Sequence, residues 1–191
     1  MKRLEIDYSL KSMDVLVSLA RYNFVNKIIN NTDLKVLDYG CGSGYGTKLL
    51  KEKFKNVTSH DTYFDNYLPK DIKVETDIKN ILKNKFDLIT CFEVIEHMDE
   101  SAQHQLMETM SNLLTNDGIL FISTVRKMEP PPTQNRRDYH IREISFNELY
   151  DFCAKHFKTI LTFGQIDQII STFNTDNQYH FLFVCTNKKN K

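Results

Sequence analysis

The feature that most constrains this 191-residue sequence is the stretch VLDYGCGSGYG at residues 36–46. A short apolar run ends there at an acid, and four glycines follow at alternate positions. A compact apolar run is typical of a buried parallel strand, while glycine permits a sharp turn and lets a ligand approach bare backbone. We therefore predict a strand at 35–39, a helix at 47–54 and a ligand site between them, because open α/β sheets bind ligands at the carboxyl ends of their strands.

The spacing of these glycines excludes two nucleotide-binding motifs. The dinucleotide fingerprint needs a glycine three residues after its second one. Counting from Gly40 that position is Tyr45, and counting from Gly42 it is Thr47. No Gly-Lys-Ser/Thr follows the run, so a phosphate-binding P-loop is excluded as well.

The run instead resembles motif I of the class I S-adenosylmethionine (SAM)-dependent methyltransferases, in the form hydrophobic-Leu-Asp-x-Gly-Cys-Gly-x-Gly. Residues 86–97, FDLITCFEVIEH, are similar to the motif IV region of small-molecule and glycan methyltransferases, and residues 117–124 resemble their fifth strand. Segments at 139–145 and 163–165 resemble methyltransferases of sugar and cell-surface polysaccharide biosynthesis. The resemblance implies SAM as the cofactor and a small molecule or a sugar unit as the methyl acceptor.

Composition limits the partners. The 25 basic and 25 acidic residues give a formal charge of zero, so no overall field attracts nucleic acid or a membrane, and we expect neither as a partner. The N-terminus lacks the apolar stretch of a signal peptide, and no run approaches the roughly 20 apolar residues of a membrane span, which predicts a cytoplasmic protein. The four cysteines show no paired metal-ligand spacing, so we expect reduced, buried thiols.

Strand-like and helix-like segments alternate along the chain. The predicted strands are 35–39, 56–60, 72–75, 86–92, 119–125, 159–163 and 179–186, and the helices after the glycine run include 101–114 and 145–156. This alternation predicts a single Rossmann-like α/β domain over residues 1–191, with a seven-stranded, mostly parallel sheet, helices on both faces and an antiparallel final hairpin. We expect a leading helix within 1–31, a substrate-covering loop at 126–139 and a frayed tail at 187–191.

The resemblance to methyltransferases assigns cofactor contacts to residues around the glycine run. Gly40, Cys41 and Gly42 would bring backbone to the methionine end of SAM, and Asp38 would lie near its ammonium group. The alternative for Asp38 is a structural role in a turn or a helix cap. Asp61 ends the second strand, at the spacing where an acid binds the ribose hydroxyls. Its alternative is an acid in a solvated loop.

The same resemblance implies three further residues at the cofactor. Asp77 and Ile78 follow the third strand, where related enzymes contact the adenine amino group and ring, and a plain surface is the alternative there. Glu93 would line the methionine end. Phe92 would form a wall of the pocket, with a place in the core as its alternative.

Methyl transfer to oxygen needs a base, and His97 and His140 are the candidates because imidazole titrates near neutrality. Each has the alternative of a structural histidine. Glu93, Glu96 and His97 stand at positions i, i+3 and i+4, on one face if the segment is helical. With His140 they form a set suited to Mg²⁺ or another divalent cation. The set resembles that of small-RNA 3′-terminal 2′-O-methyltransferases and in part that of ubiquinone-pathway O-methyltransferases, although other relatives carry Glu-His here without a metal.

The 126–139 loop is locally basic, with Arg126, Lys127, Arg136 and Arg137. These side chains would hold a phosphate or carboxylate of an anionic acceptor, or they form an ordinary solvated surface. Our leading hypothesis is O-methylation of a small molecule or sugar unit. The alternatives are a metal-dependent RNA 3′-end 2′-O-methyltransferase and a non-catalytic SAM-binding partner subunit.

Overall fold

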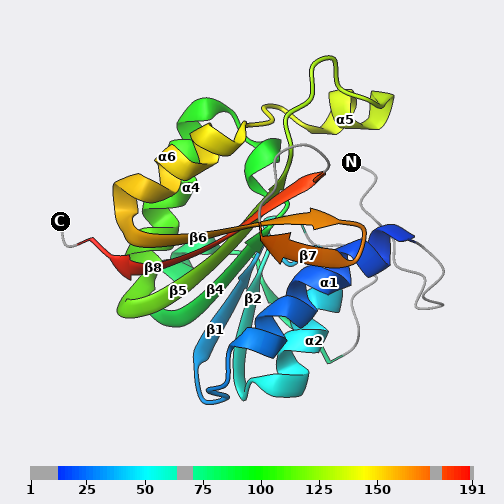
Figure 1. Cartoon of the computed structure of the whole chain (residues 1–191). Coiled ribbons are helices and arrows are strands. Elements are labelled where there is room, and N and C mark those ends of the chain that lie inside the picture. The colour runs from blue at the N-terminus through cyan, green and yellow to red at the C-terminus, as the bar shows by residue number, and fades with distance from the viewer. Residues whose placement is uncertain (1–12, 64–70, 173–177, 190–191) are drawn as a thin grey trace.

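Within the residues that this computed structural model describes, 13–63, 71–172 and 178–189, an eight-stranded sheet carries helices on both faces (Figure 1). The strand order is β3-β2-β1-β4-β5-β8-β6-β7. In this order, the first five strands pair in parallel. The pairs β5–β8, β8–β6 and β6–β7 are antiparallel. The strands are β1 Lys35–Tyr39, β2 Asn56–His60, β3 Val74–Glu75, β4 Phe86–Phe92, β5 Leu114–Val125, β6 Phe157–Ile166, β7 Ile169–Thr172 and β8 His180–Lys188. The predicted Rossmann-like α/β fold with an antiparallel end is confirmed.

The antiparallel end differs in detail from the predicted final hairpin. The two predicted strands do pair, as β6 and β8, but β6 first turns back onto the additional short strand β7. The turn places Asp167 in left-handed backbone, at φ 50°. Strand β7 lies at the edge of the sheet and exposes Ile169, Ser171 and Thr172. Its sequence therefore lacks the buried apolar run from which the other strands were predicted.

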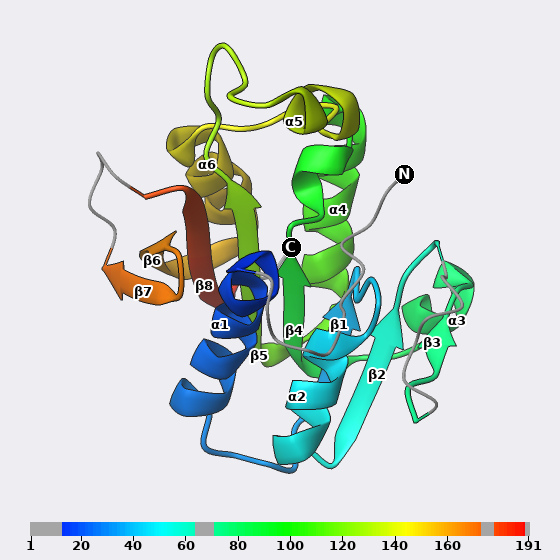
Figure 2. The same ribbon diagram turned by 90° about the vertical axis from the view of Figure 1, so that its right-hand side faces the viewer.

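Alternate residues of the central strands enter two separate cores. Val36 and Leu88 pack with α1 and α2 on one face, whereas Leu37 and Ile89 pack with α4 and α6 on the other. Figure 2 shows α1 and α2 together on the face toward the viewer. The helices are α1 Met13–Ile28, α2 Tyr45–Lys53, α3 Ile78–Leu82, the 3₁₀ turn η1 Ile95–His97, α4 Glu100–Leu113, α5 Gln134–Tyr139 and α6 Phe146–His156.

Two predicted boundaries change. Strand β5 was predicted to start at residue 119 but starts at Leu114, directly after α4, and its register with β4 shifts in this additional part. The predicted loop at 126–139 contains the short helix α5, because the Thr133 hydroxyl accepts a hydrogen bond from the Arg136 amide and caps it. In Figure 1 this segment lies beyond the carboxyl ends of the strands.

The ends of the chain are described in part. Helix α1 is the predicted leading helix, and residues 1–12 lie outside the described residues. Strand β8 continues through Lys188, and the Lys189 amide donates to the His156 carbonyl, so the predicted frayed tail is wrong at 187–189, and 190–191 are not described. All four cysteines are free and buried. Among the described helices, none has both the length and the apolar character that crossing a membrane requires.

Candidate active site

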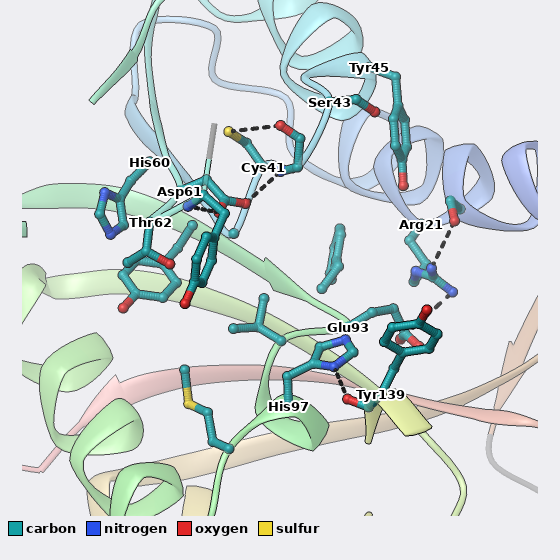
Figure 3. A pocket seen from close by; sticks show the side chains of 18 of the residues that line it. Arg21, Cys41, Ser43, Tyr45, His60, Asp61, Thr62, Glu93, His97 and Tyr139 are labelled. Atoms are coloured by element: carbon teal, nitrogen blue, oxygen red, sulfur yellow. Dashed lines mark hydrogen bonds and ion pairs between the residues drawn. The ribbon is translucent and has the colours of Figure 1, made fainter. Parts of the chain in front are cut away.

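A cavity of about 430 Å³ lies at the carboxyl ends of β1, β2 and β4, and α1 contributes to its wall (Figure 3). Side chains gather at two ends of it. We call one the glycine end, made of residues 40–43 and Asp61. We call the other the histidine end, where His97 and His140 line the cavity and the buried Glu96 lies beside them. Figure 3 shows Cys41 and Asp61 together, well apart from His97.

Left-handed backbone at Gly40 and Gly42 shapes the glycine end. Their φ angles are 76° and 54°, in a region that costs an L-residue about 1–2 kcal/mol. The amides of Gly40 and Cys41 both donate to the His60 carbonyl, at 2.8 and 3.1 Å, and tie the turn to β2. A Cβ on Gly40 would overlap the Val94 side chain, whereas one on Gly42 would meet open space. Bare backbone therefore borders the cavity at Gly42.

The structure brings Asp61 and the glycine turn together. One carboxylate oxygen of Asp61 accepts a hydrogen bond from the Gly42 amide at 2.9 Å, and the other accepts from the Tyr63 amide at 2.9 Å. Asp61 is only 8% exposed and lines the cavity. The neighbouring His60 ring bonds the Glu75 carbonyl through Nδ1 at 2.7 Å. An acceptor carboxylate thus faces the cavity beside bare backbone.

Asp38 lies buried behind the glycine end and does not line the cavity. Its carboxylate accepts hydrogen bonds from the hydroxyls of Thr47, Thr90 and Tyr22, at 2.6, 2.9 and 3.1 Å. Burial raises the pKa of Asp38 to about 6, although the three hydroxyls act to lower it. Asp38 thus joins α1, α2, β1 and β4, a role that is neither the turn nor the helix cap of the alternative. Its contact with the cofactor stays a prediction.

Asp77 and Ile78 lie away from the lining of the cavity. Asp77 is exposed and caps α3, and its side chain accepts a hydrogen bond from the Lys79 amide at 2.9 Å. Ile78 is half-buried against the core that contains α4 and α6. Among the described residues, Gly42 and Asp61 line the cavity, whereas Asp77 and Ile78 do not.

Phe92 and Glu93 both line the cavity, at the end of β4. The carboxylate of Glu93 accepts a hydrogen bond from the Ser123 hydroxyl at 2.7 Å and lies 3.9 Å from Arg21 and 3.5 Å from His180. Burial acts to raise the pKa of Glu93, but the charges of Arg21 and His180 outweigh it and lower the pKa. Glu93 is therefore an ionised partner of a buried arginine.

Glu96, His97 and His140 come together at the histidine end, each with a potential ligand atom within 4.8 Å of the others. The Nδ1 atom of His97 donates to the Tyr139 carbonyl at 2.8 Å, and Nδ1 of His140 contacts a carboxylate oxygen of Glu143 at 2.6 Å. Nε2 is consequently the atom that each ring can offer to a cation or a proton. His97 and His140 also line the cavity.

Glu93 is not one of these three residues, although its side chain is hydrogen-bonded to that of Glu96, and its role as a fourth ligand stays a prediction. The turn η1 begins only at Ile95, and Glu93 has left-handed backbone at φ 56°, so Glu93 and Glu96 do not share a helical face. Glu96 is 1% exposed and accepts a hydrogen bond from the Thr124 hydroxyl at 2.9 Å. Burial, followed by the charge of Glu93, raises the pKa of Glu96 well above its usual range.

Comparison of the sequence with models of known protein families gives a match. Residues 14–173 match the model of the methyltransferase domain family, which is most of the chain. The chain belongs to this family. This membership agrees with the resemblance that the glycine run predicted.

The methyltransferase is also similar to curated proteins named ubiquinone biosynthesis O-methyltransferase. The one from Glaesserella parasuis serovar 5 is 33% identical over 130 residues, which cover 59% of this chain and 54% of that protein. The one from Rickettsia typhi is 30% identical over 135 residues, which cover 65% and 50%. The chain thus spans about half the length of the curated relatives it matches.

Solved structures share the fold of the methyltransferase. A SAM-dependent methyltransferase from Archaeoglobus fulgidus superposes with a TM-score of 0.67 at 13% identity, over 93% of this chain and 95% of that one. The 1,6-didemethyltoxoflavin-N1-methyltransferase of Burkholderia thailandensis, solved with S-adenosylhomocysteine, gives 0.64 at 16% identity over 96% and 80%. These likenesses show the fold.

The structure adds Arg21 to the cavity of the methyltransferase, a residue that we did not predict there. Arg21 is 2% exposed on α1 and donates to the Gln165 side chain at 2.9 Å and to the Ser18 hydroxyl at 3.2 Å. A charged residue within the apolar face of a helix is the signal that marks it, because an unpaired buried charge is costly. Arg21 places a positive charge beside Glu93 in the cavity wall.

Three basic residues of segment 126–139 are occupied by partners in the segment or just after it. Arg136 pairs with Glu143 at 2.7 Å, and Lys127 pairs with Glu129 at 2.6 Å. Arg137 donates to the Gln134 side chain and to a backbone carbonyl. These contacts favour a structural role for the three side chains over the predicted binding of an anionic acceptor.

Proposed function

We propose that this methyltransferase transfers the methyl group of SAM to a hydroxyl oxygen of a small molecule. The observation that carries the proposal is the shared cavity, which Gly42 and Asp61 line at one end and His97 and His140 line at the other. The names of the curated relatives, O-methyltransferases, support an oxygen acceptor. A sugar hydroxyl belongs to the same chemical class.

The glycine end would hold the cofactor. The backbone of residues 40–42 borders open space at Gly42, which leaves room for the amino acid part of SAM. The Asp61 carboxylate is an acceptor suited to two ribose hydroxyls, and Phe92 supplies an apolar wall. When bound, SAM supplies a methyl group on a positively charged sulfur with a neutral leaving group.

The histidine end would prepare the acceptor. In-line methyl transfer asks the protein mainly to position the two reactants and exclude water, and a hydroxyl must also lose its proton. Nε2 of His97 or His140 can take that proton, since Nδ1 of each ring is already hydrogen-bonded, to the Tyr139 carbonyl or to the Glu143 carboxylate. A general base contributes about 10²–10⁴-fold to a reaction rate.

Glu96, His97 and His140 together also fit a divalent cation. One carboxylate and two imidazoles are ligands that suit Mn²⁺, Fe²⁺ or Zn²⁺, whereas Mg²⁺ prefers oxygen. Glu96 is buried with a raised pKa, and a cation beside it would favour its ionised form. Bound there, a cation would supply Lewis acidity to the acceptor hydroxyl.

The proposal is tested by binding and transfer measurements on the full chain. Calorimetry should show saturable SAM binding, and Asp61→Asn should weaken it about 10-fold because one oxygen acceptor is lost, worth about 1.4 kcal/mol. Labelled SAM should then transfer methyl to oxygen of phenols or sugars, assayed with Mn²⁺, Zn²⁺, Mg²⁺ or EDTA.

Distinct outcomes separate the alternatives. Failure of the intact chain to bind SAM overturns the proposal, and so does transfer confined to nitrogen or carbon. Salt-sensitive transfer to RNA ends in place of small molecules would support an RNA methyltransferase, and SAM binding without transfer would support a partner subunit. Full activity in EDTA would show that transfer needs no cation, and His97 and His140 would then be the candidate bases.

A further inference from the structure

The carboxylate of Glu143 contacts the histidine end from outside it. Glu143 lies 2.6 Å from Nδ1 of His140, and both side chains are largely buried, at 8% and 14% exposed. The inference drawn from this contact rests on the proposed function, in which His140 is a metal ligand or a base. The contact itself is the same in either role.

Glu143 is itself held in place by Arg136. The Nε atom of Arg136 donates to one carboxylate oxygen at 2.7 Å, and its Nη2 atom contacts the other at 2.7 Å. Nη2 also donates to the Arg126 carbonyl at 2.7 Å, and the Met128 amide approaches the second carboxylate oxygen at 3.4 Å. A two-point arginine–carboxylate pair fixes orientation as well as charge, so Glu143 is presented to His140 in one geometry.

An ionised carboxylate can only accept hydrogen bonds. Because Glu143 accepts from Nδ1, a neutral His140 carries its proton on Nδ1, and its Nε2 then holds the lone pair. His97 follows the same rule, since its Nδ1 donates to the Tyr139 carbonyl, which is also acceptor only. Two acceptors within residues 139–143 therefore select the same tautomer in both rings.

We propose that Glu143 is a positioning residue that fixes His140 as the Nδ1–H tautomer and directs its Nε2 toward Glu96 and His97. Arg136 supports it by holding the carboxylate. Carboxylates in this position behind a histidine ligand typically change metal affinity or activity by about 10–100-fold when they are removed.

The test compares Glu143→Gln with a matched control, Glu148→Gln. Glu148 pairs with the neighbouring Arg142 at 2.5 Å and caps α6, so its loss also removes an arginine–carboxylate pair close in the chain. The tautomer of His140 is read by NMR of protein labelled with ¹⁵N in its histidines. His140→Asn assigns the signal among the six histidines.

We expect the Nδ1–H form of His140 in the wild type and in Glu148→Gln, and a mixture of tautomers in Glu143→Gln. Mn²⁺ binding, followed by electron paramagnetic resonance without SAM, should weaken about 10–100-fold in Glu143→Gln and stay within about 2-fold in the control. SAM affinity should be unchanged in both, because the glycine end does not involve Glu143.

The outcomes separate this inference from the proposed function. An Nε2–H form of His140 in the wild type overturns it without any variant, and so does an unchanged tautomer in Glu143→Gln. A wild type that binds no Mn²⁺ and transfers no methyl, yet shows the expected change of tautomer, contradicts the proposed function and leaves the positioning role standing. If Glu143→Gln fails to fold by circular dichroism, Arg136→Met should show the same change of tautomer to a smaller degree.

Discussion

The two ends of the cavity are built in different ways. The glycine end is local, since Gly42 and Asp61 lie 19 residues apart and backbone amides of the turn bond directly to β2. The histidine end joins segments 42 residues apart, through the bond from His97 to the Tyr139 carbonyl. The buried Gln103 amide strengthens this junction by donating to the carbonyls of Ile95 and Arg142, at 2.9 and 2.8 Å.

This difference teaches which kind of site a sequence reveals. A turn held by its own backbone needs glycine at fixed positions, and those glycines are visible in the sequence. A junction held by side chains on distant segments needs only glutamate, glutamine and arginine, which are common elsewhere. If the two ends are independent units, a substitution at one end should leave the ligand of the other unaffected.

The largest expected effect is on methyl transfer after His97→Asn or His140→Asn. Loss of the base should lower the rate about 10²–10⁴-fold, while calorimetry with SAM should give an affinity within about 2-fold of the wild type. Nε2 of the imidazole is lost and the glycine end is untouched. Loss of SAM binding in either variant would break the comparison, because it would couple the two ends.

A smaller effect is expected when the turn itself is changed. Gly42→Ala should cost about 1–2 kcal/mol of unfolding free energy through left-handed strain alone, since its Cβ meets open space. Gly40→Ala adds overlap with Val94, which raises the expected cost by about 1–3 kcal/mol. Urea denaturation measures both.

The double variant Gly40→Ala/Val94→Ala is the control for that overlap. It should cost less than the two single variants added together, because the alanine at 94 removes the methyl group that collides. Equal costs for Gly40→Ala and Gly42→Ala would contradict the close approach of Gly40 and Val94.

The last expected effect concerns the acid behind the glycine end. The folded pKa of Asp38 is about 6, above its ordinary value of 3.8, so its contribution to stability is fully present below about pH 4 and is lost as pH rises to about 6. The loss amounts to at most about 3 kcal/mol, at 1.36 kcal/mol per pKa unit.

Asp38→Asn should not titrate, so its unfolding free energy relative to the wild type should rise by that amount between about pH 4 and 7. Thr47→Val removes a hydroxyl that lowers the Asp38 pKa, and it should move the upper limit of this window to higher pH. A difference that is independent of pH would show that burial does not perturb Asp38.

The sequence predicted the parallel strands, the glycine turn and the position of Asp61 beside it, because each depends on residues close in the chain. The position of Asp38 just before the glycines is evident from the sequence. Its burial is not, because the hydroxyls that donate to it come from α1, α2 and β4. The fold class followed from alternating patterns, whereas β7 was missed because an edge strand needs little apolar sequence.

The histidine end was predicted only in part. Residues Glu96, His97 and His140 were named, but a helical face including Glu93 was assumed where the backbone makes a left-handed step. Arg136 was predicted either to bind an anionic acceptor or to lie on a solvated surface, because its charge was visible and its partner was not. Glu143 lies seven residues away, and only the fold of the segment shows that the two side chains meet.

The place of β8 between β5 and β6 has a consequence for how the protein is made. Gln165 on β6 bonds both the Val17 carbonyl and Arg21, and so secures the helix that walls the cavity. During translation α1 leaves the ribosome early, but β6 can join the sheet only through β8. A nascent chain still holding residues 180–188 in the exit tunnel therefore lacks the bonds from Gln165 that secure α1 in the cavity wall.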